Sequence, residues 1–293
     1  MQGVKSLIEM EFPDVHIKSI EKLGEGWRNE AYLVNDELVF RFAKNEAASK
    51  ELEKEAALLP LLQANLSIEI PQFSYFYNKK DRLAFAGYKL LTGVLLEEDG
   101  VSKLNQQARK AIASDLAQFI TGLRSFPALK AIKLGAPLFE PRQFFIHLLQ
   151  DARFHIFPVI NSQLQSYVLR RFQAYLDTAE HFLYEPCVVH ADLSPDHFIL
   201  DPTMTCLSGI IDFGDLCVTD PDYEFIYILE DGGEEFTRDV LKQCNHDAIE
   251  RCLQKLSFFV TFDHIRYVLE GMRRGEEAWI LEGLTALEEE MKT

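Results

Sequence analysis

Two short segments near the middle of the sequence set polar side chains between apolar runs. The first, residues 190–197, reads HADLSPDH and is flanked by Val188-Val189 and by residues 198–200 (FIL). The second, residues 210–215, reads IIDFGD. The apolar runs predict short buried strands with carboxylates at their exits. Because a buried carboxylate is costly unless a cation or a hydrogen-bond donor meets it, the two segments predict a functional site.

Asp192, His197 and Asp212 have the residue types and the order that phosphoryl transfer requires. In the catalytic loop of kinases, an Asp is followed five residues later by a metal-binding Asn, and an Asp-Phe-Gly sequence comes after it. Here His197 stands five residues after Asp192, and Asp212 opens an Asp-Phe-Gly sequence. We therefore predict that Asp192 orients the attacking hydroxyl and that His197 and Asp212 bind Mg²⁺. The alternative is that the aspartates cap turns and that His197 is a core histidine.

These segments, together with Asp220-Pro221-Asp222, resemble the aminoglycoside phosphotransferases, and in particular the 2''-phosphotransferase branch. That branch carries His where most relatives carry Asn. The similarity extends to Gly24-Glu25-Gly26, to residues 85–88 and to an acidic run at residues 222–235, so it covers nearly the whole chain. The resemblance implies an α+β, bilobal, protein-kinase-like fold, with a small antiparallel β-sheet lobe that carries one helix and a larger, mainly helical lobe. We expect residues 1–92 to form the first lobe, with a hinge near 86–92, and residues 93–293 to form the second.

The resemblance also implies an activity, which is Mg²⁺-dependent transfer of the γ-phosphoryl group of ATP or GTP to an aminoglycoside hydroxyl. The acceptor would be the 2''-hydroxyl, and the modification would confer antibiotic resistance. Three alternatives remain open: a kinase of another small hydroxyl compound (a macrolide, choline or a sugar), a nucleotide-binding pseudokinase, and a non-catalytic acidic protein that binds cations. A macrolide pocket should be more apolar than the acidic run suggests.

The N-terminal residues predict a helix at 4–11 and then an antiparallel sheet from strands at 15–23, 31–34 and 38–42. Gly24 and Gly26 lie between the first two strands, where the absence of a Cβ lets backbone amides approach phosphates. Asn29 stands where the kinase pattern has its third glycine, so the loop alone is weak evidence for a nucleotide site.

A cation on the third strand, held by a helix glutamate, should pair with the nucleotide phosphates. Strand alternation puts Arg41 on the face opposite Phe40 and Phe42, so we favour Arg41 over Lys44, which lies beyond the strand. Residues 46–59 predict a helix that Pro60 kinks or ends. Glu55 is the expected partner of the cation.

Residues 72–77 and 82–91 predict a hairpin that leads into the hinge. The resemblance implies that backbone groups around Tyr88 and Leu90 bind the purine edge, although an ordinary sheet edge is the alternative. Helices are predicted at 102–123, 141–157, 162–183, 237–256, 257–273 and 276–291, and Ser208-Gly209 predicts the turn between the strands that carry the metal ligands. The short interval between Asp215 and Asp220 leaves no room for the long activation segment of protein kinases, which favours a small-molecule acceptor.

Residues 222–235 contain six acidic residues and no Lys, Arg or His, and such a patch beside the catalytic loop can bind the ammonium groups of a polycationic sugar. The alternative is a solvated acidic helix end. By resemblance, Ser194 supports the phosphate loop, and Glu270 and Trp279 belong to the wall of the acceptor cleft. The expected substrate-binding residues are Asp222, Glu230, Asp231, Glu234, Glu235 and Trp279.

The composition limits the kinds of partner that the protein is expected to bind. The 293 residues include 46 acidic and 30 basic side chains, and the net charge of −16 argues against nucleic-acid binding. None of the five cysteines forms a Cys-x-x-Cys pair, and no apolar run approaches the length of a membrane span. We therefore expect a cytoplasmic monomer that binds a nucleotide and a small cationic substrate and no membrane.

Overall fold

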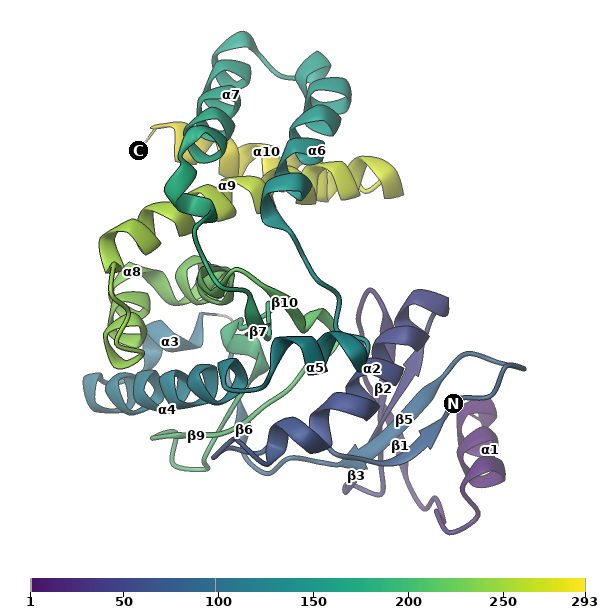
Figure 1. The fold of residues 1–293 in the computed structure, drawn as a ribbon. Helices are drawn as coiled ribbons and strands as arrows, with labels where there is room; N and C mark the ends of the chain where they lie inside the picture. The colour runs from purple at the N-terminus through teal and green to yellow at the C-terminus, as the bar shows by residue number, and fades with distance from the viewer. Residues whose placement is uncertain (1, 98, 293) are drawn as a thin grey trace.

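The computed structural model describes residues 2–97 and 99–292 and has an α+β fold. A five-stranded antiparallel sheet with helices on it comes first, and a largely helical part follows (Figure 1). This architecture confirms the predicted fold class. The boundary between two lobes at residue 92 stays a prediction.

The N-terminal sheet has the strand order β1-β2-β3-β5-β4. Its strands are β1 (Ile20–Glu25), β2 (Asn29–Val34), β3 (Leu38–Ala43), β4 (Phe73–Tyr77) and β5 (Phe85–Lys89). Asn35 and Asp36 join β2 to β3 with φ angles of 56° and 57°, the left-handed conformation that a tight hairpin turn requires. The central position of β3 places its side chains between the two helices that cover the sheet.

Each face of the sheet buries the apolar side chains that alternation assigns to it. Phe40 and Phe85 pack on the face covered by α1 (Gln2–Glu11), together with Ile8. Ala86 lies on the opposite face, in a cluster with Leu52 of α2 (Glu46–Gln63). Arg41 pairs in register with Ala86, so its side chain points toward α2, as predicted.

Helix α2 begins with an N-cap at Asn45, whose side chain accepts a hydrogen bond from the backbone amide of Ala48 at 2.9 Å. The helix does not end at Pro60 but continues to Gln63. Since Pro60 lies near the C-terminal end, it costs α2 one backbone donor without interrupting the buried stripe that includes Leu58 and Leu62.

The helical part is built around α4 (Gln106–Arg124), whose buried residues Ile112, Leu116 and Phe119 share one core with strand β7 (Cys187–Val189). In Figure 1, α6 and α7 rise from this body beside α9 and α10. The other helices are α3 (Gly100–Lys103), α5 (Ala128–Lys133), α6 (Pro141–Asp151), α7 (Ser162–Asp177), α8 (Ile226–Gln243), α9 (Ile249–Arg274) and α10 (Glu277–Lys292).

Several helix boundaries differ from the prediction. Helix α7 ends at Asp177 and not at residue 183. Helix α9 joins the end of the helix expected at 237–256 to the one expected at 257–273, because no Gly or Pro interrupts it before Gly271, whereas residues 237–243 belong to α8. The chain instead breaks between α8 and α9, where Asn245 has a φ of 53°. Within α8, Gly233 has a φ of 79°, so the helix is interrupted near the end of the acidic run, just before Glu234.

Five short strands frame the predicted site. β7 pairs with β10 (Cys217–Thr219), and β8 (Phe198–Leu200) lies between β6 (Val94–Leu95) and β9 (Leu207–Ile210). The predicted turn at Ser208-Gly209 is wrong, because Gly209 pairs with Ile199 inside the β8–β9 ladder. The turn lies at residues 201–206, where the Asp201 carboxylate accepts hydrogen bonds from the amides of Thr205 and Cys206.

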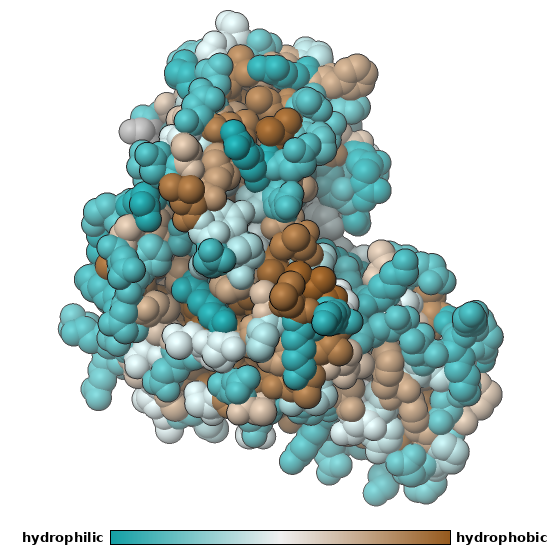
Figure 2. Space-filling view, in the orientation of Figure 1, coloured by the Kyte–Doolittle hydropathy of each residue, from teal (hydrophilic) through white to brown (hydrophobic). Residues whose placement is uncertain are grey.

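Hydrophilic side chains cover most of the face seen in Figure 2. A brown patch stands out near α5, where Leu129, Ile132 and Leu138 are exposed (Figure 2). Across residues 2–97 and 99–292, no helix combines the length and the apolar character needed to cross a bilayer.

Candidate active site

Asp192 and His197 lie in the loop that leaves β7. Ala191, which precedes Asp192, has a φ of 67°, a strained conformation for a non-glycine residue. The His197 ring donates from Nδ1 to the backbone carbonyl of Asp192 at 2.9 Å, and the same nitrogen is 3.8 Å from the Asp192 carboxylate. This bond fixes the ring and leaves Nε2 as the nitrogen that faces Asp212.

The surroundings of Asp192 favour its neutral form more than water does. Burial raises the pKa of Asp192 to about 7, and the carboxylates of Asp215 and Asp212 add to the rise, while His197 opposes it. Burial works against protonation of His197, but Asp192 and Asp212 outweigh it, so the pKa of His197 is raised. An acid that titrates near neutrality can accept or hold a proton in this loop.

Asp212 leaves β9 in the left-handed region, with a φ of 63°. One carboxylate oxygen is 3.2 Å from Nη2 of Arg41, and the other is 4.0 Å from Nε2 of His197. Burial would raise the pKa of Asp212, but Arg41 and His197 outweigh it and the pKa is lowered. The strained backbone therefore presents an ionised carboxylate to the imidazole.

The ligand atoms that His197 and Asp212 offer fit a divalent cation. The 4.0 Å separation of Nε2 and Oδ2 is too long for a hydrogen bond, so neither atom is used by the other and both are left to one ion. Asp196 also lies 4.0 Å from the same nitrogen, but Asp196, His197 and Asp212 do not come together as one three-ligand group. Mg²⁺ prefers oxygen ligands, so the imidazole is the less usual member of the set.

Arg41, and not Lys44, pairs with the helix glutamate. Its Nη1 is 2.7 Å from Glu55, and both side chains are buried. Burial raises the pKa of Glu55, although Arg41 opposes the rise. Lys44 is partly exposed and binds Glu25 at 2.6 Å and the carbonyl of Gly26 at 3.3 Å. Arg41 thus bridges α2 and Asp212, whereas Lys44 closes the glycine loop from outside.

The glycine loop reaches the Asp-Phe-Gly segment through Arg28. The Arg28 guanidinium donates to Asp215 at 2.8 Å and lies 3.4 Å from Glu51. A Cβ added at Gly24 would meet nothing within 4 Å, and one added at Gly26 would meet only the Asn29 carbonyl at 3.8 Å. Both glycines therefore leave open space on the loop.

The two predicted purine-binding positions differ in how their backbones are engaged. Tyr88 pairs with Val39 of β3 and Phe73 of β4, and burial raises the pKa of its phenol to about 12. The Leu90 amide donates to the carbonyl of Glu37 at 2.7 Å, so this N–H is used inside the protein.

The acids of the predicted patch have different partners. Ser194 donates to Asp231 at 2.8 Å, which joins α8 to the catalytic loop. Glu230 lies 3.7 Å from His264. Glu234 and Glu235 follow the break at Gly233 and pair with Arg238 at 2.8 Å and Arg109 at 3.5 Å, respectively.

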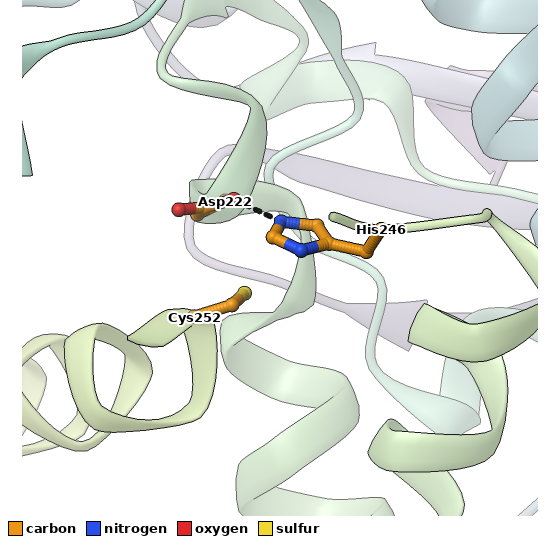
Figure 3. Close-up of side chains that lie close together, drawn as sticks. All are labelled: Asp222, His246 and Cys252. Carbon is orange, nitrogen blue, oxygen red and sulfur yellow. Dashed lines mark hydrogen bonds and ion pairs between the residues drawn. The ribbon is translucent and has the colours of Figure 1, made fainter. Parts of the chain in front are cut away.

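Asp222 lies in an internal cluster with His246 and Cys252 (Figure 3). Its carboxylate accepts from Nε2 of His246 at 2.9 Å and from Lys255 at 3.1 Å. Burial opposes ionisation, but the bond from His246 and the charge of Lys255 outweigh it, so the pKa of Asp222 is lowered. His246 and Lys255 thus already engage the Asp222 carboxylate inside the protein, away from an open acidic surface.

Trp279 and Glu270 lie at the end of the helical part. The Trp279 ring stacks on Trp27 of the glycine loop, with centroids 4.7 Å apart and an interplanar angle of 6°. Glu270 accepts from Nε of Arg273 at 2.7 Å and of Arg274 at 2.5 Å.

Two buried residues hold the site together in ways that we did not predict: Glu224, which we counted with the acidic patch, and Lys54, to which we assigned no role. Glu224 accepts from the amide of Ala191 at 3.0 Å, and burial raises its pKa to about 7. Lys54 donates to the carbonyls of Gly214 and Leu216 at 2.6 and 2.9 Å, and burial lowers its pKa. The available signal for Lys54 was its place one turn before the core residue Leu58.

Comparisons with known proteins show which family and which solved structures this chain is similar to. A family model described as a phosphotransferase enzyme family matches residues 19–259. A solved structure of APH(2'')-IIIa with GDP and kanamycin shares 40% identity, with a TM-score of 0.96 over 99% of this chain and 98% of that chain. A gentamicin complex of APH(2'')-IIa shares 25% identity, with a TM-score of 0.81 over 99% and 98%. A macrolide 2'-phosphotransferase of type I shares the fold, at 21% identity and a TM-score of 0.77 over 98% and 96%.

Proposed function

Because the chain belongs to the phosphotransferase enzyme family, we propose that it transfers the γ-phosphoryl group of a purine nucleoside triphosphate to an aminoglycoside hydroxyl. The observation that carries this proposal is that the side chains of Asp192, His197, Asp212 and Arg41 lie next to one another, each within 4.0 Å of another member of the group. The similar structure with GDP and kanamycin supports GTP as donor, the 2''-hydroxyl as acceptor and resistance as the outcome.

In this proposal Asp192 orients the acceptor hydroxyl and takes its proton as the oxygen attacks phosphorus. Its pKa of about 7 suits a base that must be ionised before the reaction and can hold a proton after it. His197 holds the loop through its bond to the Asp192 carbonyl, so the carboxylate keeps one orientation. Ser194 does the same from the other side through Asp231.

Asp212 and His197 would hold Mg²⁺. When bound, the ion supplies charge neutralisation for the phosphate oxygens. Arg41 is oriented by Glu55 and reaches the edge of the same site, where a guanidinium can bind phosphate oxygens in a bidentate manner. The glycine loop at Gly24 and Gly26 would cover the phosphates, with the backbone near Tyr88 and Leu90 at the purine.

The acceptor would bind through carboxylates on the interrupted helix α8. We assign Glu230, Asp231, Glu234 and Glu235 to the ammonium groups of the sugar, and Trp279 to the wall of the cleft. Asp222 instead supports the start of α8 from inside, through His246 and Lys255. A group of carboxylates suits a cationic acceptor better than a neutral or apolar one, which favours an aminoglycoside over a macrolide.

The test is a coupled nucleotide-release assay with GTP and ATP against kanamycin, gentamicin, a macrolide and choline. We expect GDP release that depends on kanamycin, a product phosphorylated at the 2''-hydroxyl, and little activity with the macrolide or choline. Asp192→Asn should lose this activity while retaining nucleotide binding. Nucleotide turnover that no aminoglycoside stimulates would exclude the proposed acceptor, and nucleotide binding without turnover would favour the pseudokinase alternative.

A further inference from the structure

The nucleotide-side loop and the acceptor-side helices meet through aromatic rings. Trp27 follows Gly26 in the loop between β1 and β2, and its ring lies 4.7 Å from that of Trp279 in α10, nearly parallel to it. Tyr267 of α9 stacks on Trp279 with centroids 5.5 Å apart and an angle of 23°. In Figure 1, the joined ends of α9 and α10 lie above the N-terminal sheet. Three rings therefore link segments that are about 250 residues apart in sequence.

A guanidinium completes this contact. The Cζ atom of Arg274 is 4.4 Å from the centroid of Trp27 and 5.5 Å from that of Trp279. Its Nε donates to Glu270, which also binds Arg273. The aromatic rings and the Glu270 carboxylate thus already hold one cation, which is the chemistry that an ammonium group of a substrate would use.

Separating Trp27 from Trp279 requires little free energy. Trp27 is 48% exposed, and an aromatic pair contributes roughly 1 kcal/mol beyond its buried area. The next residue, Arg28, binds Asp215 beside the proposed metal ligand Asp212. One short loop therefore contacts the phosphate side of the site through Arg28 and the acceptor side through Trp27.

We infer that Trp27 is a positioning residue that couples the two substrates: a nucleotide that holds the glycine loop closed also holds Trp27 against Trp279, and so completes the acceptor wall. The inference rests on the proposed function and adds a residue from the nucleotide side to the acceptor site. The fitting ligand is an amino sugar, whose ring can lie against the indoles and whose ammonium group can replace Arg274 at Glu270. Because coupling between binding sites is reciprocal, kanamycin should tighten GDP binding by the same factor as GDP tightens kanamycin binding.

The test is calorimetric titration of the whole protein with kanamycin, with and without saturating GDP and Mg²⁺. In the wild type we expect GDP to lower the kanamycin Kd about 3- to 10-fold, the range set by one aromatic contact. Trp27→Ala should lose this dependence, whereas Trp27→Phe should retain most of it. Phe154→Ala, which truncates an exposed aromatic on the π-helical turn after α6, is the matched control and should behave as the wild type.

Steady-state kinetics give a second measurement. Trp27→Ala should raise the KM for kanamycin about 3- to 10-fold with kcat changed less than about 2-fold, since no group that reacts is removed. The double variant Trp27→Ala/Trp279→Ala should be no worse than the Trp279→Ala variant, because both changes break one contact.

The outcomes separate the inference from the function on which it rests. A wild type that neither binds nor phosphorylates an aminoglycoside overturns both. A wild type that phosphorylates kanamycin, with a Trp27→Ala variant that keeps the full dependence on GDP, overturns only the coupling. Additive effects of the two tryptophan substitutions would also overturn it.

Discussion

Three features distinguish Asp212 from an ordinary turn residue. Its backbone is in the left-handed region, its carboxylate is shared between Arg41 and His197, and its pKa is lowered although burial alone would raise it. A residue that only caps a turn needs none of these features, because the side-chain amide of an asparagine would cap the same turn. Such strain persists where the surrounding structure supports it, and a charged ligand site is a sufficient reason.

Asp212→Asn should therefore reduce kcat by at least about 100-fold, because the substitution removes the charge that the metal needs and keeps the shape of the side chain. We expect each single acid of the acceptor patch to cost less. Turnover of GTP with kanamycin measures the effect, and Asp196→Asn is the control because Asp196 lies equally far from Nε2 of His197. A fall in kcat of less than tenfold for Asp212→Asn would remove Asp212 from the metal site.

Arg41 and Glu55 form a deeply buried ion pair beside the site. Arg41→Ala should lower the free energy of unfolding by about 3–5 kcal/mol, because it leaves the carboxylate of Glu55 buried without its partner. Replacing both residues, as in Arg41→Met/Glu55→Leu, should restore much of this stability while nucleotide binding stays impaired. Urea unfolding and nucleotide titration separate the two effects. Lys44→Ala is the matched control, and a loss of nucleotide affinity as large as that of Arg41→Ala would assign the phosphate contact to Lys44.

At the scale of elements, the 3₁₀ segment Pro221–Phe225 anchors the catalytic loop from behind. Glu224 in this segment accepts from the amide of Ala191, and its other oxygen, Oε1, is buried without a hydrogen-bond partner in the described chain. Burial raises the pKa of Glu224 from 4.5 to about 7. The protonated form is thus favoured by the folded state.

This shift predicts a pH dependence of stability. A carboxyl group with a raised pKa in the folded state contributes stability below about pH 4.5, and the contribution is lost as the pH rises through 7. Relative to Glu224→Gln, the wild type should lose up to about 3 kcal/mol of unfolding free energy between pH 5 and pH 8. Urea denaturation of both proteins across this range measures the difference. A difference that stays constant with pH would show that Glu224 remains ionised throughout.

The elements that the sequence predicted well are those with strong local patterns. The alternation of Phe40, Arg41 and Phe42 predicted β3 and the direction of Arg41, and the helix predicted at 102–123 contains most of α4. Boundaries set by tertiary contacts were missed. Gly209 looks like a turn residue but lies in β9, where a Cβ would come 3.1 Å from the carbonyl of Glu69, so it permits close backbone packing.

In the candidate site too, residues in a local sequence pattern were predicted, and contacts between distant residues were not. Asp192, His197 and Asp212 could be found because kinases space such residues closely along the chain. The contacts of Lys54 with Gly214 and of Trp27 with Trp279 join residues that are far apart in sequence, and no local pattern encodes them. Asp222 was counted with the acceptor acids because sequence spacing does not show which carboxylates face inward and meet a buried lysine.

At the scale of the whole molecule, the parts that carry nucleotide and acceptor residues are joined near the site by a few polar and aromatic contacts. Arg28 reaches Asp215, Lys54 reaches the backbone of the Asp-Phe-Gly segment, and Trp27 reaches α10. The Arg28 ion pair is partly exposed, and such pairs contribute about 0–1 kcal/mol. The Arg28 contact therefore sets the relative position of the parts more than it stabilises the fold.

The net charge of −16 predicts how salt affects catalysis. In the proposed function the acids on α8 bind a polycationic acceptor, and Glu234 and Glu235 are the most exposed of the four assigned to it, with side chains 66% and 82% accessible. Electrostatic attraction speeds the encounter of opposite charges and is screened by ions, so kcat/KM for kanamycin should fall about tenfold between roughly 20 and 200 mM salt. The kcat at saturation should change little, because screening acts on the approach and not on phosphoryl transfer. Glu234→Gln/Glu235→Gln should flatten the salt dependence, whereas Glu288→Gln/Glu289→Gln on α10 is the matched control and should leave it unchanged. If kcat/KM for kanamycin does not depend on salt, the acids on α8 do not steer the acceptor.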